Sequence, residues 1–164
     1  MPDLFVHAAA GYLVVFREKY KYLIPSIVLL GCIFPDLIRG PLLLGANLQD
    51  SLGVRLISSE AIITLQIFHS PIPLVLQAWL FCFLFERELR WKVFVSFFLG
   101  VLLHLLLDAG QRAYHISYLW LFPFSFENPI QGLWWADESG WITIISALVA
   151  TMLLCWKYFE PRSS

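Results

Sequence analysis

Charged side chains are scarce in this chain. Asp, Glu, Lys and Arg make up 14% of the 164 residues, whereas hydrophobic residues make up 59%. A soluble globular domain usually has about a quarter charged residues, and a water-soluble chain of this length would not hide so much apolar surface. The scarcity excludes an ordinary water-soluble domain and predicts an integral membrane protein.

Clustered basic residues, paired cysteines and linker-like tracts are also missing. The net charge is −1 and Lys and Arg occur only in short groups, which argues against the phosphate recognition of a nucleic-acid-binding protein. The cysteines Cys32, Cys82 and Cys155 lie far apart in apolar runs and form no CxxC pair. Since no repeat or low-complexity tract divides the chain, we expect a single integral-membrane domain over residues 1–164.

What the chain has instead is a series of apolar runs. About twenty apolar residues span a bilayer, and shorter runs suffice where the membrane thins or flanking side chains snorkel. The sequence therefore predicts an all-α fold, a polytopic membrane bundle of about five transmembrane helices, some of them short or interfacial. The runs cover residues 4–16, 22–34, 71–85, 93–107 and 141–159. The segment 37–68 mixes apolar and polar stretches, and we expect it to lie along the membrane interface.

Basic residues predict the orientation of these helices, because loops rich in Lys and Arg stay on the cytoplasmic side. Such residues occur at 17–21, 86–92 and 157–162. With these three regions inside, five helices alternate in direction and the N-terminus lies outside. Three further arginines, Arg39, Arg55 and Arg112, fall on the outer side and weaken the count without reversing it. We expect a multi-pass protein of the inner (cytoplasmic) membrane.

Five ionisable residues interrupt the apolar runs or flank them. They are His7, Asp36, His69, His104 and Asp108. In the predicted topology all five come near the outer ends of four helices, and His104 and Asp108 share one helical face because they are four residues apart. Imidazole nitrogens and carboxylate oxygens form a ligand set suited to zinc, or to iron or manganese. The sequence predicts a divalent transition-metal site on the outer side, with His69, His104 and Asp108 as first ligands and His7 and Asp36 beside them.

Plainer interpretations of these residues stay open. A single histidine in a membrane helix is more often hydrogen-bonded to a neighbour than bound to a metal. Asp36 follows Pro35 and would end a helix there, and Ser70 would cap a helix that begins at Pro71. His115 falls in an outer loop, where we expect it to be exposed and not a ligand. The same cluster would also serve a proton or ion transporter, or a non-catalytic scaffold.

Several short motifs around these residues follow one another in a definite order. They are the early His7 with small residues after it, "GCIFPDL" with Asp36, "FHSPI" with His69, "GVLLHLLLDAG" with His104 and Asp108, and the trailing "LWLFPFS". Over residues 5–126 this order resembles a family of small bacterial and archaeal inner-membrane proteins classed as membrane-bound metal-dependent hydrolases. That family often has a second acidic residue shortly after the one matched by Asp36, where this chain has "DLIRG".

The resemblance implies hydrolysis of an ester or phosphoester, with a metal that activates water and polarises the substrate oxygen. Asp36 would be either a metal ligand or the general base that takes the proton of water. A site at headgroup depth favours a lipid or another amphiphilic substrate that enters from the bilayer. No nucleic-acid partner is expected, and the sequence leaves the oligomeric state open.

Overall fold

The structure is a computed structural model. It describes residues 4–15, 22–53, 58–110, 118–127, 129–130 and 132, and the pairs 144–145, 148–149, 151–152 and 155–156, without the side chains of Phe5, 41–44 and 46–52. Outside the described residues lie the basic groups at 17–21 and 157–162, Arg55, Arg112, His115 and most of the predicted helix 141–159. The four described pairs of that helix are helical and exposed.

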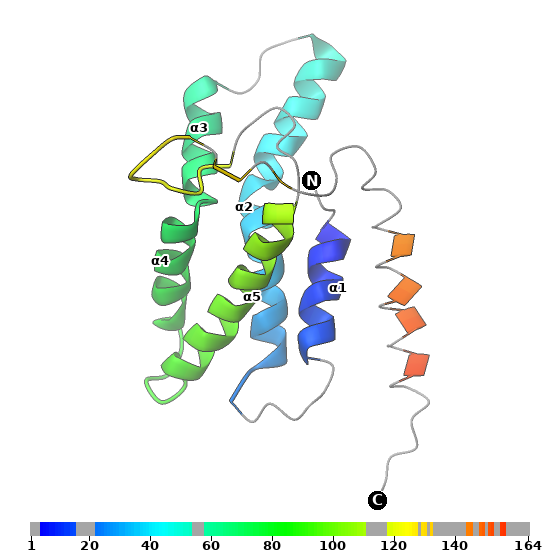
Figure 1. Cartoon of the computed structure of the whole chain (residues 1–164), viewed down its shortest axis with the longest axis vertical. Coiled ribbons are helices and arrows are strands. Elements are labelled where there is room, and N and C mark those ends of the chain that lie inside the picture. The colour runs from blue at the N-terminus through cyan, green and yellow to red at the C-terminus, as the bar shows by residue number, and fades with distance from the viewer. Residues whose placement is uncertain are drawn as a thin grey trace, which may run out of the picture.

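The regular secondary structure of the described residues is entirely helical and includes no strand, so the prediction of an all-α fold is confirmed (Figure 1). The helices are α1 (Leu4–Val15), α2 (Pro25–Leu52), α3 (Ser59–Phe68), α4 (Pro71–Cys82) and α5 (Arg90–Gly110). Prolines at the first position of α2 and of α4 suit helix starts, because the proline nitrogen would lack an intrahelical partner there in any case.

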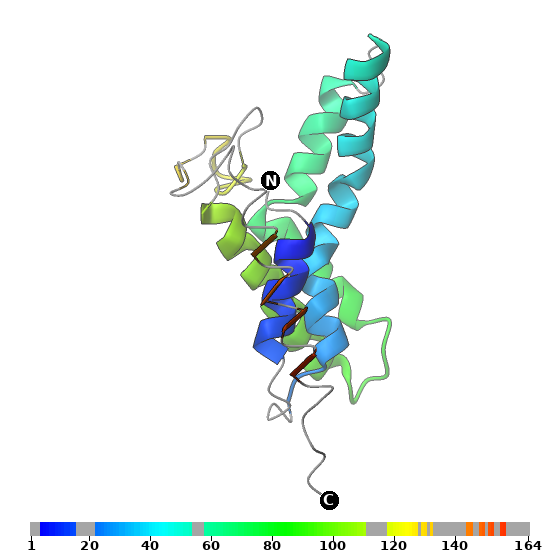
Figure 2. The same cartoon turned by 90° about the vertical axis from the view of Figure 1, so that its right-hand side faces the viewer.

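Helix α2 differs most from the prediction. The sequence suggested a helix over 22–34 and an interfacial segment over 37–68, but α2 continues for 28 residues and the chain returns as α3. The interpretation of Asp36 as a helix end is therefore wrong. Pro35 removes a single hydrogen bond of its own helix, and the packing of α2 against α1, α3 and α5 outweighs that loss. The upper part of α2 and α3 extend beyond the other helices (Figures 1 and 2).

Helices α2 and α5 run in the same direction, and one series of contacts between the two segments recurs at an offset of 72 residues. The contacting pairs are Ile24 with Ser96, Val28 with Gly100, and Cys32 with His104. The next step of this register places Asp36 beside Asp108. Each helix thus contributes a row of residues four apart, which is the ridge that helices use for packing.

Two glycines bring the backbones of α2 and α5 close together. A Cβ atom added to Gly100 would lie 2.2 Å from the carbonyl oxygen of Val28, and one added to Gly31 would lie 2.2 Å from that of Phe97. Membrane helices commonly approach one another through small residues of this kind. Phe97 also belongs to a core shared by α4 and α5, which includes Leu74, Ala78 and Val101.

Helices α3 and α4 are separated at His69 and Ser70 and bend by 64° at that break. Ser70 occupies the N-cap position of α4 as predicted, but its hydroxyl donates to the carbonyl of Ile67 at 2.6 Å and caps no backbone N–H of α4. Ser70 therefore holds the bend itself. The bend matters for the site because His69 lies in it.

Length and apolar composition make α5 the one helix in the described ranges able to cross a bilayer alone. The bent pair of α3 and α4 would count as a second span if it crosses as one unit, and α1 is a shorter apolar helix. The helical part of the prediction is thus shown, whereas a bundle of about five spans stays a prediction.

Candidate metal centre

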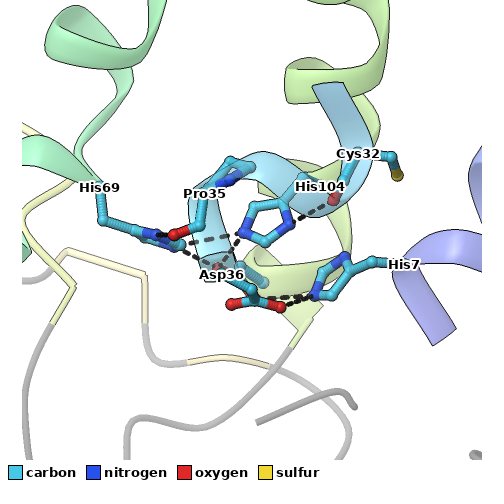
Figure 3. Close-up of polar contacts among 7 residues, drawn as sticks. His7, Cys32, Pro35, Asp36, His69 and His104 are labelled. Carbon is cyan, nitrogen blue, oxygen red and sulfur yellow. Dashed lines mark hydrogen bonds and ion pairs between the residues drawn. The ribbon is translucent and has the colours of Figure 1, made fainter. Parts of the chain in front are cut away.

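The five residues singled out in the sequence lie together at one level of the bundle (Figure 3). His7 comes from α1, Asp36 from α2, and His69 from the bend between α3 and α4, while His104 and Asp108 lie one turn apart on α5. All five are buried. Residues distant in the sequence therefore meet in a site from which water is largely excluded.

His69, His104 and Asp108 form a triangle of ligand atoms. The Oδ2 atom of Asp108 lies 2.8 Å from Nε2 of His69 and 3.2 Å from Nε2 of His104. The two Nε2 atoms are 3.3 Å apart. Two ring nitrogens and one carboxylate oxygen thus lie within 3.3 Å of one another.

The opposite nitrogens of these two rings face backbone carbonyls of α2. Nδ1 of His104 donates to the carbonyl of Cys32 at 2.9 Å, and Nδ1 of His69 makes a longer contact of 3.4 Å with that of Pro35 (Figure 3). A carbonyl oxygen can only accept, so each Nδ1 carries the proton. In a neutral ring this leaves the Nε2 lone pair free and turned toward the centre, the arrangement usual for histidines that bind metals.

Three acceptors that meet in this way repel one another unless a cation lies among them. A proton on one imidazole would serve, and so would a metal ion. Tetrahedral zinc with bonds of about 2.0 Å to nitrogen or oxygen separates its ligand atoms by about 3.3 Å. The three observed separations, 2.8, 3.2 and 3.3 Å, fit such an ion without a change of helix position.

His7 and Asp36 form the second half of the cluster. Nε2 of His7 lies 3.5 Å from Oδ2 of Asp36 and 3.6 Å from Oδ1 of Asp108, which is too long for hydrogen bonds. Its ring stacks on that of His104 with centroids 3.9 Å apart. Within the described ranges, both nitrogens of His7, Oδ1 of Asp36 and Oδ1 of Asp108 have no hydrogen-bond partner. Buried polar atoms in this state are costly and suit an ion or a water molecule.

The charges around the cluster favour a cation. Asp36 and Asp108 supply two carboxylates, and Arg39 is the one buried basic side chain that the described residues place nearby. Tyr118 lies against this region, and burial raises the pKa of its phenol, so Tyr118 stays neutral at pH 7. With neutral imidazoles, the site has an excess of negative charge that a divalent ion would offset.

Two buried side chains beside the cluster were not predicted from the sequence. Arg39 was counted as part of an outer segment, but it lies on α2 with 5% of its surface exposed. Gln66 lies on α3 with 4% exposed. Each is three residues from a member of the cluster, Asp36 or His69, and this spacing would have indicated a shared helical face had both segments been predicted as helices.

Comparison with known proteins adds no assignment: no family model, no curated protein and no solved structure matches the chain. The resemblance to membrane-bound metal-dependent hydrolases therefore stays a prediction. What bears on function is the geometry of the cluster.

Proposed function

We propose that this chain is a membrane-embedded, metal-dependent hydrolase of an ester or phosphoester, with one divalent transition metal held by His69, His104 and Asp108. The observation that carries the proposal is the orientation of the two imidazoles. Both Nδ1 atoms face carbonyls of α2, and the two Nε2 atoms lie 2.8 and 3.2 Å from the same carboxylate oxygen, Oδ2 of Asp108. Backbone contacts thus pre-orient the ligand atoms before any ion binds.

Zinc suits this set best, because two imidazoles and a carboxylate with one open position are typical ligands of catalytic zinc. Manganese and iron are the alternatives among metals that accept nitrogen and oxygen ligands. When bound, such a metal lowers the pKa of a water molecule and polarises the oxygen of the substrate.

Asp36 is the side chain best suited to act as general base. A base needs a free acceptor within reach of the water it deprotonates, and Oδ1 of Asp36 has no partner among the described residues. Asp36 is also the most exposed member of the cluster, at 8%. His7, between Asp36 and Asp108, would hold the two carboxylates apart or add a ligand.

The position of the cluster supports a lipid or other amphiphilic substrate. The exposed face of α4 carries large apolar side chains one turn apart, among them Ile72, Leu76, Trp79 and Leu80, as expected of a surface that faces hydrocarbon. The cluster lies toward the end of α5 away from the basic loop at 86–90. If that loop is cytoplasmic, the site faces the outer side of the inner membrane.

The metal assignment is tested by elemental analysis of detergent-purified protein prepared without chelators. Wild-type protein should hold about one zinc per chain, and His69→Ala, His104→Ala and Asp108→Asn should each lose it, because a site with only three protein ligands cannot spare one of them. His115→Ala is the matched control, as His115 is the chain's remaining histidine, and it should keep the metal. Wild-type protein without metal would contradict the assignment.

The orientation is tested by reporter fusions after Arg90 and after Ser164. Both should report the cytoplasm, because both follow basic segments. A reporter signal from the outer side at Arg90 would place the cluster on the cytoplasmic side and remove the support for an outer substrate.

A non-catalytic scaffold is the second candidate, and one observation favours it. His69 and Asp108 are 2.8 Å apart, so a proton alone would join the bend of α3 and α4 to α5. Metal-loaded protein that hydrolyses phosphoesters and carboxyl esters in mixed micelles no faster than His104→Ala would favour this scaffold. Transport has less support, because the ionisable groups gather at one level of the bundle instead of lining a path.

A further inference from the structure

Arg39 is held in an unusual environment for an arginine. It is buried on α2, and its Nε and Nη1 atoms find no hydrogen-bond acceptor among the described residues. The ion pairs found in the described part of the chain all involve histidine instead. The guanidinium carbon lies 5.6 Å from the centre of the Tyr118 ring, and that ring lies 6.0 Å from the ring of His69. Arg39 is therefore buried close to the cluster but does not take part in it.

Gln66 occupies the matching place on α3. Its amide nitrogen and oxygen are both buried and without a partner among the described residues. Helices α2 and α3 run in opposite directions (Figure 1). Arg39 comes three residues after Asp36 on α2, and Gln66 comes three residues before His69 on α3. Both therefore lie on the same side of the cluster, about one helical turn beyond it. Helix direction and spacing thus place Arg39 and Gln66 at a similar height in the bundle, about one turn from the His and Asp residues.

A buried guanidinium without a counter-ion is strongly unfavourable, and burial of a charge is normally accompanied by pairing. The nearest carboxylates, Asp36 and Asp108, are directed at His7 and the other histidines and supply no pair for Arg39. An anion from outside the chain would supply one. Nε and Nη1 lie on opposite edges of the guanidinium, and each forms with Nη2 an edge that can bind two oxygens of a phosphate or carboxylate at once.

We infer that Arg39 and Gln66 form a binding site for a phosphate group one helical turn from the metal cluster. The arginine fork would take two phosphate oxygens and the Gln66 amide a third, which is more acceptors than a carboxylate offers. The inference rests on the proposed function in that it narrows the substrate to a phosphoester. The binding site itself requires no metal, and its test is separate for that reason.

The experiment measures binding of two probes to the purified full chain by titration calorimetry, with and without zinc. One probe is orthophosphate, added to protein in lipid-free detergent. The other is phosphatidic acid, supplied in nanodiscs against phosphatidylcholine alone. Binding of orthophosphate indicates recognition of the bare phosphate, whereas binding of phosphatidic acid alone indicates a lipid headgroup; both outcomes support the site if they depend on Arg39.

Arg39→Met should weaken binding by about 10- to 100-fold, as expected when hydrogen bonds to a charged group are lost. Arg39→Lys keeps the charge without the fork, so a loss of roughly fivefold is expected, and this variant serves if Arg39→Met does not fold. Gln66→Leu should also weaken binding, by less. Arg87→Met is the matched control, because Arg87 is exposed at the other end of the bundle, and it should bind like wild type.

The inference is overturned if wild-type protein binds neither probe, or if both Arg39 variants bind as tightly as wild type. Zinc content separates this result from a failure of the proposed function. Arg39→Met with normal zinc and lost phosphate binding supports the site, and Arg39-dependent binding in a protein that takes up no zinc supports the site while contradicting the metal assignment.

Discussion

The two ends of the α2 and α5 interface are built from the same register but from different chemistry. At the end near the basic loop, Gly31 and Gly100 bring the backbones together, and the polar Ser96 is satisfied: its hydroxyl donates to the Lys92 carbonyl at 2.7 Å and accepts from the N–H of Ile24 at 2.9 Å. At the other end, the same rows carry the His and Asp cluster, in which several buried polar atoms lack partners among the described residues. The polar groups at the first end are satisfied within the chain, whereas those at the other end are not, as expected of the metal site that we propose.

The comparison also explains how the site is positioned. His104 follows Gly100 by one turn and donates to Cys32, which follows Val28 by one turn. The hydrogen bond is possible because the glycine contact holds the helices close enough for an imidazole to reach a carbonyl of the neighbouring helix. The close contact at Gly31 and Gly100 therefore fixes the distance between α2 and α5, and the position of His104 depends on that distance.

Gly100→Val should have the largest effect and should disrupt both the close contact of α2 with α5 and the His and Asp cluster. The new side chain would meet the backbone of α2, where no flexible side chain can yield, and a loss of more than about 4 kcal/mol of stability is expected for such a backbone collision. The measurement is thermal unfolding in detergent together with metal content. Gly110→Val is the matched control, since no atom of the described residues would lie within 4 Å of a Cβ atom at that position. Normal stability of Gly100→Val would contradict the close approach of the two helices.

Asp36→Asn should lower the turnover of the cluster while leaving its zinc content unchanged. Loss of a general base typically lowers turnover by about a hundredfold or more, while the amide keeps the size of the side chain. Turnover of phosphoesters and carboxyl esters in mixed micelles and zinc content are the two measurements. Glu86→Gln, an exposed change near the other end, should leave both unchanged. If zinc is lost together with turnover, Asp36 is a ligand and not the base.

Ser96→Ala should have the smallest effect, a small loss of stability without a loss of zinc. It removes the acceptor of the Ile24 N–H, and a loss of about 1 kcal/mol is expected for one such hydrogen bond. Unfolding midpoints and metal content are compared with those of Ser59→Ala, an exposed serine that should be neutral. A lower zinc content in Ser96→Ala would contradict the view that Ser96 and the His and Asp cluster act independently.

The elements that the sequence predicted well are those with strong local signals. The apolar run at 93–107 became α5, extended at both ends, and Pro71 began α4 as expected. Pro35 inside α2 misled the prediction, because its local preference for a helix end was weaker than the contacts of α2 with α1, α3 and α5. Arg39 and Gln66 were missed for the same reason, since their burial depends on α2 and α3 continuing past Asp36 and before His69.

From the sequence alone follow the apolar character of the chain, its helical fold and the short list of ionisable residues, because composition and a spacing of four residues are local properties. Only the tertiary structure decided the register of α2 against α5, which hydrogen-bonds His104 to Cys32, and the bend that brings His69 to Asp108. These contacts join segments far apart in the chain, and their geometry depends on how closely whole helices pack. That distance is a property of all the side chains between them, which no single stretch of sequence contains.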